Sequence, residues 1–82
     1  MGLDTVELVM AFEEKFGLDI SDAVAAELIT PRDVIDYLMA NGAGGESSRE
    51  EVAQLVRQVI EAQTGTYDFT EDSRFVQDMH LD

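Results

Sequence analysis

The sequence contains no cysteine, a single histidine (His80), and only five basic residues against 18 acidic ones. Without cysteine it cannot form disulfides, thiolate zinc sites or thiol nucleophiles, and one histidine cannot build a metal cluster or a relay. The formal net charge of −13 repels nucleic acid and anionic membranes, so neither is expected as a partner. A basic protein surface is the natural electrostatic complement of this chain.

Long apolar runs and catalytic motifs are also absent. No apolar stretch approaches the roughly 20 residues of a membrane span, and the start lacks the basic region of a secretory signal. No phosphate-binding loop, nucleophile elbow, zinc-protease motif or calcium-loop spacing is present. We therefore expect a soluble, cytoplasmic domain that is not an enzyme, with no catalytic residues and no metal.

What is present is an apolar pattern with the period of a helix. The 82 residues make one small domain, and 45% apolar content is too much for a disordered acidic tail. No strand-like alternation occurs, so the predicted class is all-α. Capping and stop signals place three main helices and one short helix at about 3–16, 23–28, 31–40 and 49–64.

The segments between and after these helices differ in character. Residues 41–48 are rich in glycine and serine and predict a flexible linker. Residues 66–82 read as a long loop with irregularly spaced apolar side chains, which either covers the core or is a functional loop. The predicted core residues share helical spacing: Leu8, Val9, Phe12, Phe16, Val34, Ile35, Leu38, Met39, Val52, Leu55, Val56, Val59 and Ile60. Arg57, Gln58 and Glu61 are predicted on the outer face of the last helix.

The first helix carries a second apolar row, formed by Leu3, Val6 and Met10, nearly opposite its core stripe. Carboxylates of Glu7, Glu13 and Glu14 border this row. One interpretation is packing under a neighbouring loop; the other is a docking surface for a partner with an apolar groove rimmed by basic residues. The adjacent Glu13 and Glu14 are typical of a solvated helix face rather than of an acid/base pair.

Residues 3–16, Leu-Asp-Thr-Val-Glu-Leu-Val-Met-Ala-Phe-Glu-Glu-Lys-Phe, closely resemble the second helix of acyl carrier proteins. Residues 29–38 resemble the fourth helix of that family, so that 3–40 resembles helices two to four. Residues 49–82 resemble the first helix and long loop, which in the family come first. Joining Asp82 to Met1 restores the family's Asp-x-Leu-Asp motif. The resemblance implies a circularly permuted, acyl-carrier-protein-like four-helix bundle over residues 1–82, opened at the modification site and closed through 41–48.

Acyl carrier proteins bear 4'-phosphopantetheine on the serine of an Asp-Ser-Leu motif and carry acyl intermediates as thioesters in fatty acid or polyketide synthesis. Here Gly2 stands next to that position, between Asp82 and Leu3, and has no hydroxyl to modify. The other serines are not in such a motif, and Ser73 reads as a loop cap. We therefore expect no cofactor-binding residue in this chain, which would remain in the apo form.

The resemblance also favours the docking interpretation of the second apolar row. The residues that match the family's recognition positions are Asp4, Val6, Glu7, Met10, Glu13 and Glu14. The partners implied are basic surfaces of acyl-processing enzymes and of a phosphopantetheinyl transferase. The interior that shelters acyl chains in the family would be lined by core residues together with Ile29.

Three alternatives stay open. The chain is expected to be a monomer, and exchange of the 49–82 unit between two chains would give a swapped dimer. An acidic helical interaction module without carrier chemistry is the alternative function. The Met-Gly start and the linker composition favour an engineered permutation over a natural one.

Overall fold

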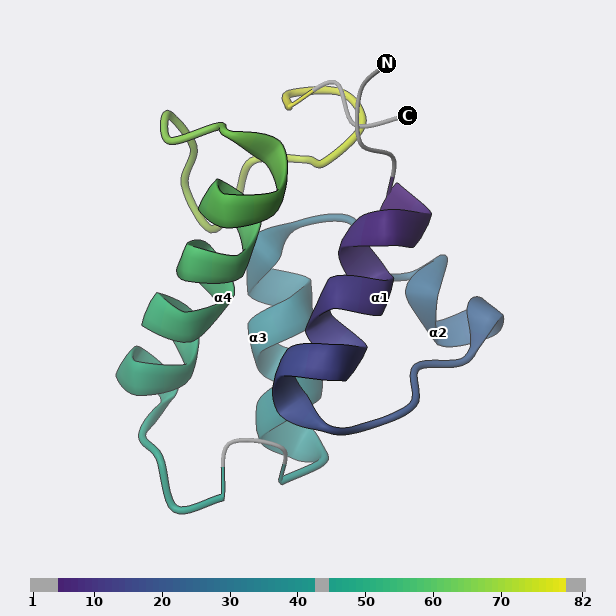
Figure 1. Ribbon diagram of the computed structural model, residues 1–82, viewed down its shortest axis with the longest axis vertical. Coiled ribbons are helices and arrows are strands. Elements are labelled where there is room, and N and C mark those ends of the chain that lie inside the picture. Colours follow the sequence, from purple (N-terminus) through teal and green to yellow (C-terminus); the bar gives the residue numbers. More distant parts are fainter. Residues whose placement is uncertain (1–4, 43–44, 80–82) are drawn as a thin grey trace.

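Four helices follow one another in a computed structural model that describes residues 5–42 and 45–79. They are α1 (Thr5–Phe16), α2 (Asp22–Ala25), α3 (Pro31–Ala40) and α4 (Arg49–Thr64). α1 and α3 run in one direction and α4 in the opposite one, with α2 set beside α1 (Figure 1). No strand occurs in these two ranges, so the predicted all-α class and the number of helices are confirmed.

Side-chain caps start the three later helices. The Ser21 hydroxyl accepts a hydrogen bond from the backbone of α2. Thr30 with Asp33, and Ser48 with Glu51, each form a complete capping box at the start of α3 and α4. Because a capping box satisfies two backbone N–H groups that the helix leaves unpaired, these two starts agree with the sequence prediction.

Glycine ends the first and last helices. Gly17 and Gly65 take left-handed φ angles of 66° and 72°. A residue with a Cβ adopts this conformation only at a cost, which is why a glycine marks each stop so clearly in the sequence.

The short helix is shorter than predicted. It occupies Asp22–Ala25 rather than residues 23–28. The reason lies downstream, because the backbone N–H groups of Ile29 and Thr30 both donate to the Asp33 carboxylate. These two residues therefore belong to the N-terminal cap of α3, and α2 ends before them.

The core lies where α4 packs directly on both α3 and α1. Its buried residues are Leu8, Phe12, Ile20, Val34, Ile35, Leu38, Val52, Val56, Val59, Ile60, Phe69, Phe75 and Met79. Val9, Phe16 and Leu55 are half-buried, at the edge of the predicted stripes. Two predicted interior residues are exposed: Met39 in the last turn of α3, and Ile29 in the turn before it.

The segment 66–79, called the strap below, crosses one end of the bundle (Figure 1). Its apolar side chains Phe69, Phe75 and Met79 are buried in the core, whereas Tyr67 is 65% exposed. Of the two interpretations of this long loop, the structure supports the one in which the segment covers the core. Ser73 caps a turn in it as predicted, accepting a hydrogen bond from the Thr70 N–H at 2.9 Å.

Arg57 is a correction to the sequence prediction, which placed it on the outer face of α4. Its side chain is half-buried and reaches from α4 to the strap. The guanidinium donates to the backbone oxygens of Tyr67 and Phe69 and lies 4.2 Å from the centroid of the Phe69 ring. Its Nε pairs with Glu61 one turn along α4, at 2.9 Å. A periodicity argument treats a charged residue as solvated and cannot detect such a contact.

Glu71 joins three elements. Its carboxylate lies 2.9 Å from Arg49 of α4 and 3.6 Å from Arg32 of α3. These guanidinium groups, Arg49 first, lower the pKa of the Glu71 carboxyl below its ordinary value of 4.5. The ionised form is therefore favoured more in the folded chain than in the unfolded one.

Replacing Glu71 by Gln tests this linkage. A depressed folded-state pKa stabilises the fold above pH 4.5, and the contribution is lost as the pH falls through the lower folded value. We expect Glu71→Gln to be less stable than the parent at pH 7, and the difference to shrink progressively below pH 4.5. Urea unfolding followed by circular dichroism across this range measures it. A difference that grows towards acid pH would contradict the assignment, and Glu46→Gln in the linker is the control.

Candidate docking site

The second apolar row of the first helix is exposed to solvent. Val6 is 63% and Met10 59% exposed, so neither packs under a loop. Glu7 and Glu14 are exposed beside them on α1, and Glu13 is half-buried. The structure therefore brings these five predicted residues to one helix. Asp4, which the sequence analysis also assigned to this surface, lies outside the described residues. We call Val6, Glu7, Met10, Glu13 and Glu14 the docking surface.

Next to Met10 the surface is hollowed. An open depression of about 360 Å³ is lined by Met10, Glu13, Glu14, Gly17, Leu18 and Asp19. Apolar side chains and three carboxylates thus share its walls.

Glu13 makes a structural hydrogen bond that was not predicted from the sequence. Its carboxylate accepts a hydrogen bond from the Ile20 N–H at 2.7 Å, seven residues further along the chain. Its backbone oxygen also accepts from Gly17 and Leu18 at the end of α1. Glu13 therefore holds the turn that lets Ile20 reach the core. No local sequence motif predicts this hydrogen bond, because it forms only when the turn after α1 brings Ile20 back to Glu13.

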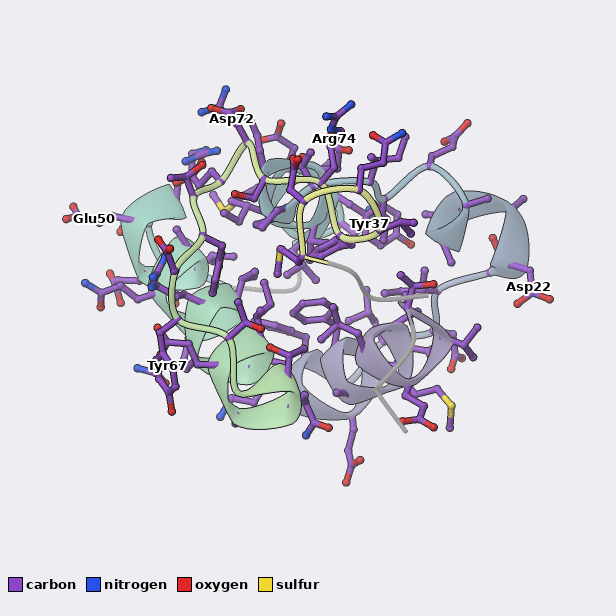
Figure 2. The ribbon with its side chains drawn as sticks, turned by 90° about the horizontal axis from the view of Figure 1, so that it is seen from above. Asp22, Tyr37, Glu50, Tyr67, Asp72 and Arg74 are labelled. Carbon is purple, nitrogen blue, oxygen red and sulfur yellow. The ribbon has the colours of Figure 1, made fainter. Side chains whose placement is uncertain are left out.

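The four arginines lie on α3, α4 and the strap. In the described part of the chain, Arg32, Arg49, Arg57 and Arg74 pair with carboxylates of α3, α4 and the strap. Figure 2 shows Asp72 and Arg74 projecting outward from the strap, away from Asp22 on α2. The carboxylates of Glu14 and Asp19 are outside these ion pairs. On α1 itself, Lys15 is the one basic residue beside Glu7, Glu13 and Glu14.

A second hollow lies at the start of α1. It has a volume of about 530 Å³ and is lined mainly by apolar groups of Thr5, Ala25, Leu28, Ile29, Phe75 and Val76. Arg74 and Gln77 stand at its rim. Residues from the two ends of the described chain, Thr5 and the 75–77 stretch, thus meet at one site. The expected junction of Asp82, Gly2 and Leu3 lies outside the described residues.

Other site types find no support in the described residues. No group of three or more His, Cys, Asp or Glu side chains there could hold a metal ion. No helix within the same ranges is long and apolar enough to cross a membrane.

Comparison with known proteins identifies a partial relative. The chain is 58% identical over 36 residues to an acyl carrier protein of Campylobacter hominis. These residues are 44% of this chain and 46% of the relative, so the match spans about half the length of that curated protein. No protein-family profile and no solved structure matches the chain.

The partial match and the fold agree with each other. Four helices without strands in the described residues are consistent with an acyl-carrier-protein-like helical bundle, and the 58% identity supports the acyl carrier protein family. The matched relative is a carrier protein and not an enzyme, which agrees with the expectation of a non-enzymatic chain.

Substitutions of the two adjacent glutamates of α1 should differ in their effect on the free energy of unfolding. We expect Glu13→Ala to lower the free energy of unfolding by about 1 kcal/mol, because the Ile20 N–H loses a charged acceptor. Glu14→Ala, at an exposed position of the same helix, should change it by less than about 0.5 kcal/mol. Urea denaturation of both variants measures the pair. Equal effects would show that the Glu13 bond contributes nothing to the turn.

Proposed function

We propose that the chain is an acyl-carrier-type docking module whose elements follow a circularly permuted order. The partial identity to an acyl carrier protein is the observation that carries this proposal. Two chains of similar length that match over less than half of each are what a permuted order predicts, because a collinear alignment must stop where the order changes. The meeting of Thr5 with residues 75–77 at one hollow also supports it.

The function proposed for this module is presentation of an acidic helix to basic partner surfaces. Val6 and Met10 supply an exposed apolar strip, and Glu7, Glu13 and Glu14 supply its charged rim. Charge around such a strip speeds encounter and sets orientation, while the small apolar area keeps the complex short-lived. Partners of this kind are acyl-processing enzymes of fatty acid or polyketide synthesis and a phosphopantetheinyl transferase. The absence of cysteine fits a reducing compartment such as the cytoplasm.

The module is proposed to remain without its prosthetic group. The family attaches 4'-phosphopantetheine to a serine hydroxyl, and the serines of this chain, Ser21, Ser47, Ser48 and Ser73, stand in no attachment motif. Three of these hydroxyls also have structural partners, since Ser21 and Ser48 cap helices and Ser73 caps a turn in the strap.

Incubation with a phosphopantetheinyl transferase and coenzyme A tests the apo state. We expect the intact mass to stay unchanged, whereas a gain of about 340 Da would overturn the proposal. The Gly2→Ser variant is the comparison for the same assay. Its modification would show that the carrier surface is retained, and its failure would favour the alternative function, an acidic interaction module without carrier chemistry. Light scattering on the same sample should report a particle near 9.1 kDa rather than the swapped dimer.

Charge reversal tests the docking surface. We expect Glu14→Lys to weaken binding to the transferase by about 5-fold and to reduce the salt dependence of that binding, because it removes a rim charge and adds a repulsive one. Asp68→Lys changes net charge equally at an exposed site on the strap instead of α1, and should have less than about a 2-fold effect. Surface plasmon resonance at two salt concentrations measures both. Equal losses would mean that only net charge matters.

A further inference from the structure

The strap is an unusual component of the core. It contributes three buried side chains, Phe69, Phe75 and Met79, yet none of its residues lies in one of the four helices. Its internal backbone bonds are local, such as those from the Asp78 and Met79 N–H groups to the Arg74 oxygen. An irregular segment of 14 residues therefore depends on a small number of outside contacts for its order.

Two backbone hydrogen bonds connect the strap to the start of α3. The Arg32 N–H donates to the Glu71 oxygen at 2.9 Å, and the Phe75 N–H donates to the Ile29 oxygen at 2.9 Å. Both bonds would break if the strap moved away. Because Arg32 itself belongs to α3, its amide reports on docking of the strap without being part of it.

Arg57 makes the closest side-chain connection from α4. Its guanidinium donates to two carbonyl groups near the start of the strap, those of Tyr67 and Phe69, and lies over the Phe69 ring. Glu61 orients the guanidinium from the opposite side through the 2.9 Å ion pair. The Glu71 pairs with Arg32 and Arg49 add a second connection between side chains whose exposure is similar to that of Arg57.

The helices do not need the strap to touch one another. α4 packs directly on α3 and on α1, and these contacts do not involve residues 66–79. We propose that the strap opens and closes as a unit on the folded helices, and that the contacts of Arg57 with Tyr67 and Phe69 hold it closed. Closure completes the core and forms one wall of the apolar hollow that contains Ile29, Phe75 and Val76; opening removes that wall and exposes the faces of α1, α3 and α4 beneath it.

This device is independent of the carrier proposal, because it follows from contacts within the chain alone. Access to the apolar interior then depends on the equilibrium between the closed and the open strap. An apolar probe should therefore bind better when the Arg57 contacts with the strap are weakened, even though no residue that lines the hollow has changed.

Hydrogen exchange by NMR tests the proposal on the full chain. We expect the amides of Arg32 and Phe75 to share one protection factor, at least about 10-fold below those of Leu38 and Ile60 in the helical core. Arg57→Met should lower the protection of Arg32 and Phe75 by a further factor of about 10 and leave Leu38 and Ile60 unchanged. Nile red emission should increase in the same variant while the far-ultraviolet circular dichroism stays constant.

The control is Arg74→Met, because Arg74 is a strap arginine whose ion pair with Asp78 stays within the strap. It should leave the Arg32 amide unchanged. If Arg57→Met does not fold, Arg57→Lys keeps the charge but cannot hold both carbonyls, and should lower protection of the two reporter amides by about 3-fold. Equal protection of all four amides in the parent chain, or an equal fall of all four in the Arg57 variant that folds, would overturn the proposal.

Discussion

Burial of the apolar face of α4 is the interaction on which the rest of the structure depends. Val52, Val56 and Ile60 are almost fully buried, and α4 is the helix that packs on both α3 and α1. Burying one such side chain contributes roughly 1.5 to 3 kcal/mol, which no surface ion pair in this protein approaches. A chain of this size has only one such core, so every other element is placed by how it reaches that face.

The carboxylates of the described residues have different neighbours in different parts of the fold. Arg32 and Arg49 connect α3 and α4 to the strap, where the carboxylates of Glu71 and Asp72 would otherwise repel one another. Around α1 the carboxylates border exposed apolar side chains instead. The same residue type thus stabilises the fold in one place and borders the proposed docking surface in another. Glu13 belongs to that proposed surface and also holds the turn before Ile20.

Part of this organisation could be predicted before folding. Capping boxes and stop glycines are local, so the bounds of α3 and α4 follow from a few neighbouring residues such as Thr30 and Gly65. Helical spacing placed Val6 and Met10 in a second apolar row but left open whether a loop covers them, and the structure shows that they are exposed. Ile29 was predicted incorrectly because its exposure depends on the turn between α2 and α3. Arg57 was predicted incorrectly because its contacts lie 10 and 12 residues along the chain, in a segment without periodicity.

The sequence by itself determined the all-helical class, the main helix bounds, the acidic character of the first helix and the lack of an attachment serine in a carrier motif. These properties depend on residue identity and on spacings of three or four positions. Only the tertiary structure decided that the strap covers the core, that Arg57 binds it, and that Thr5 meets residues 75–77 at one hollow. Such contacts join residues far apart in sequence, and side-chain packing, rather than any local preference, selects them.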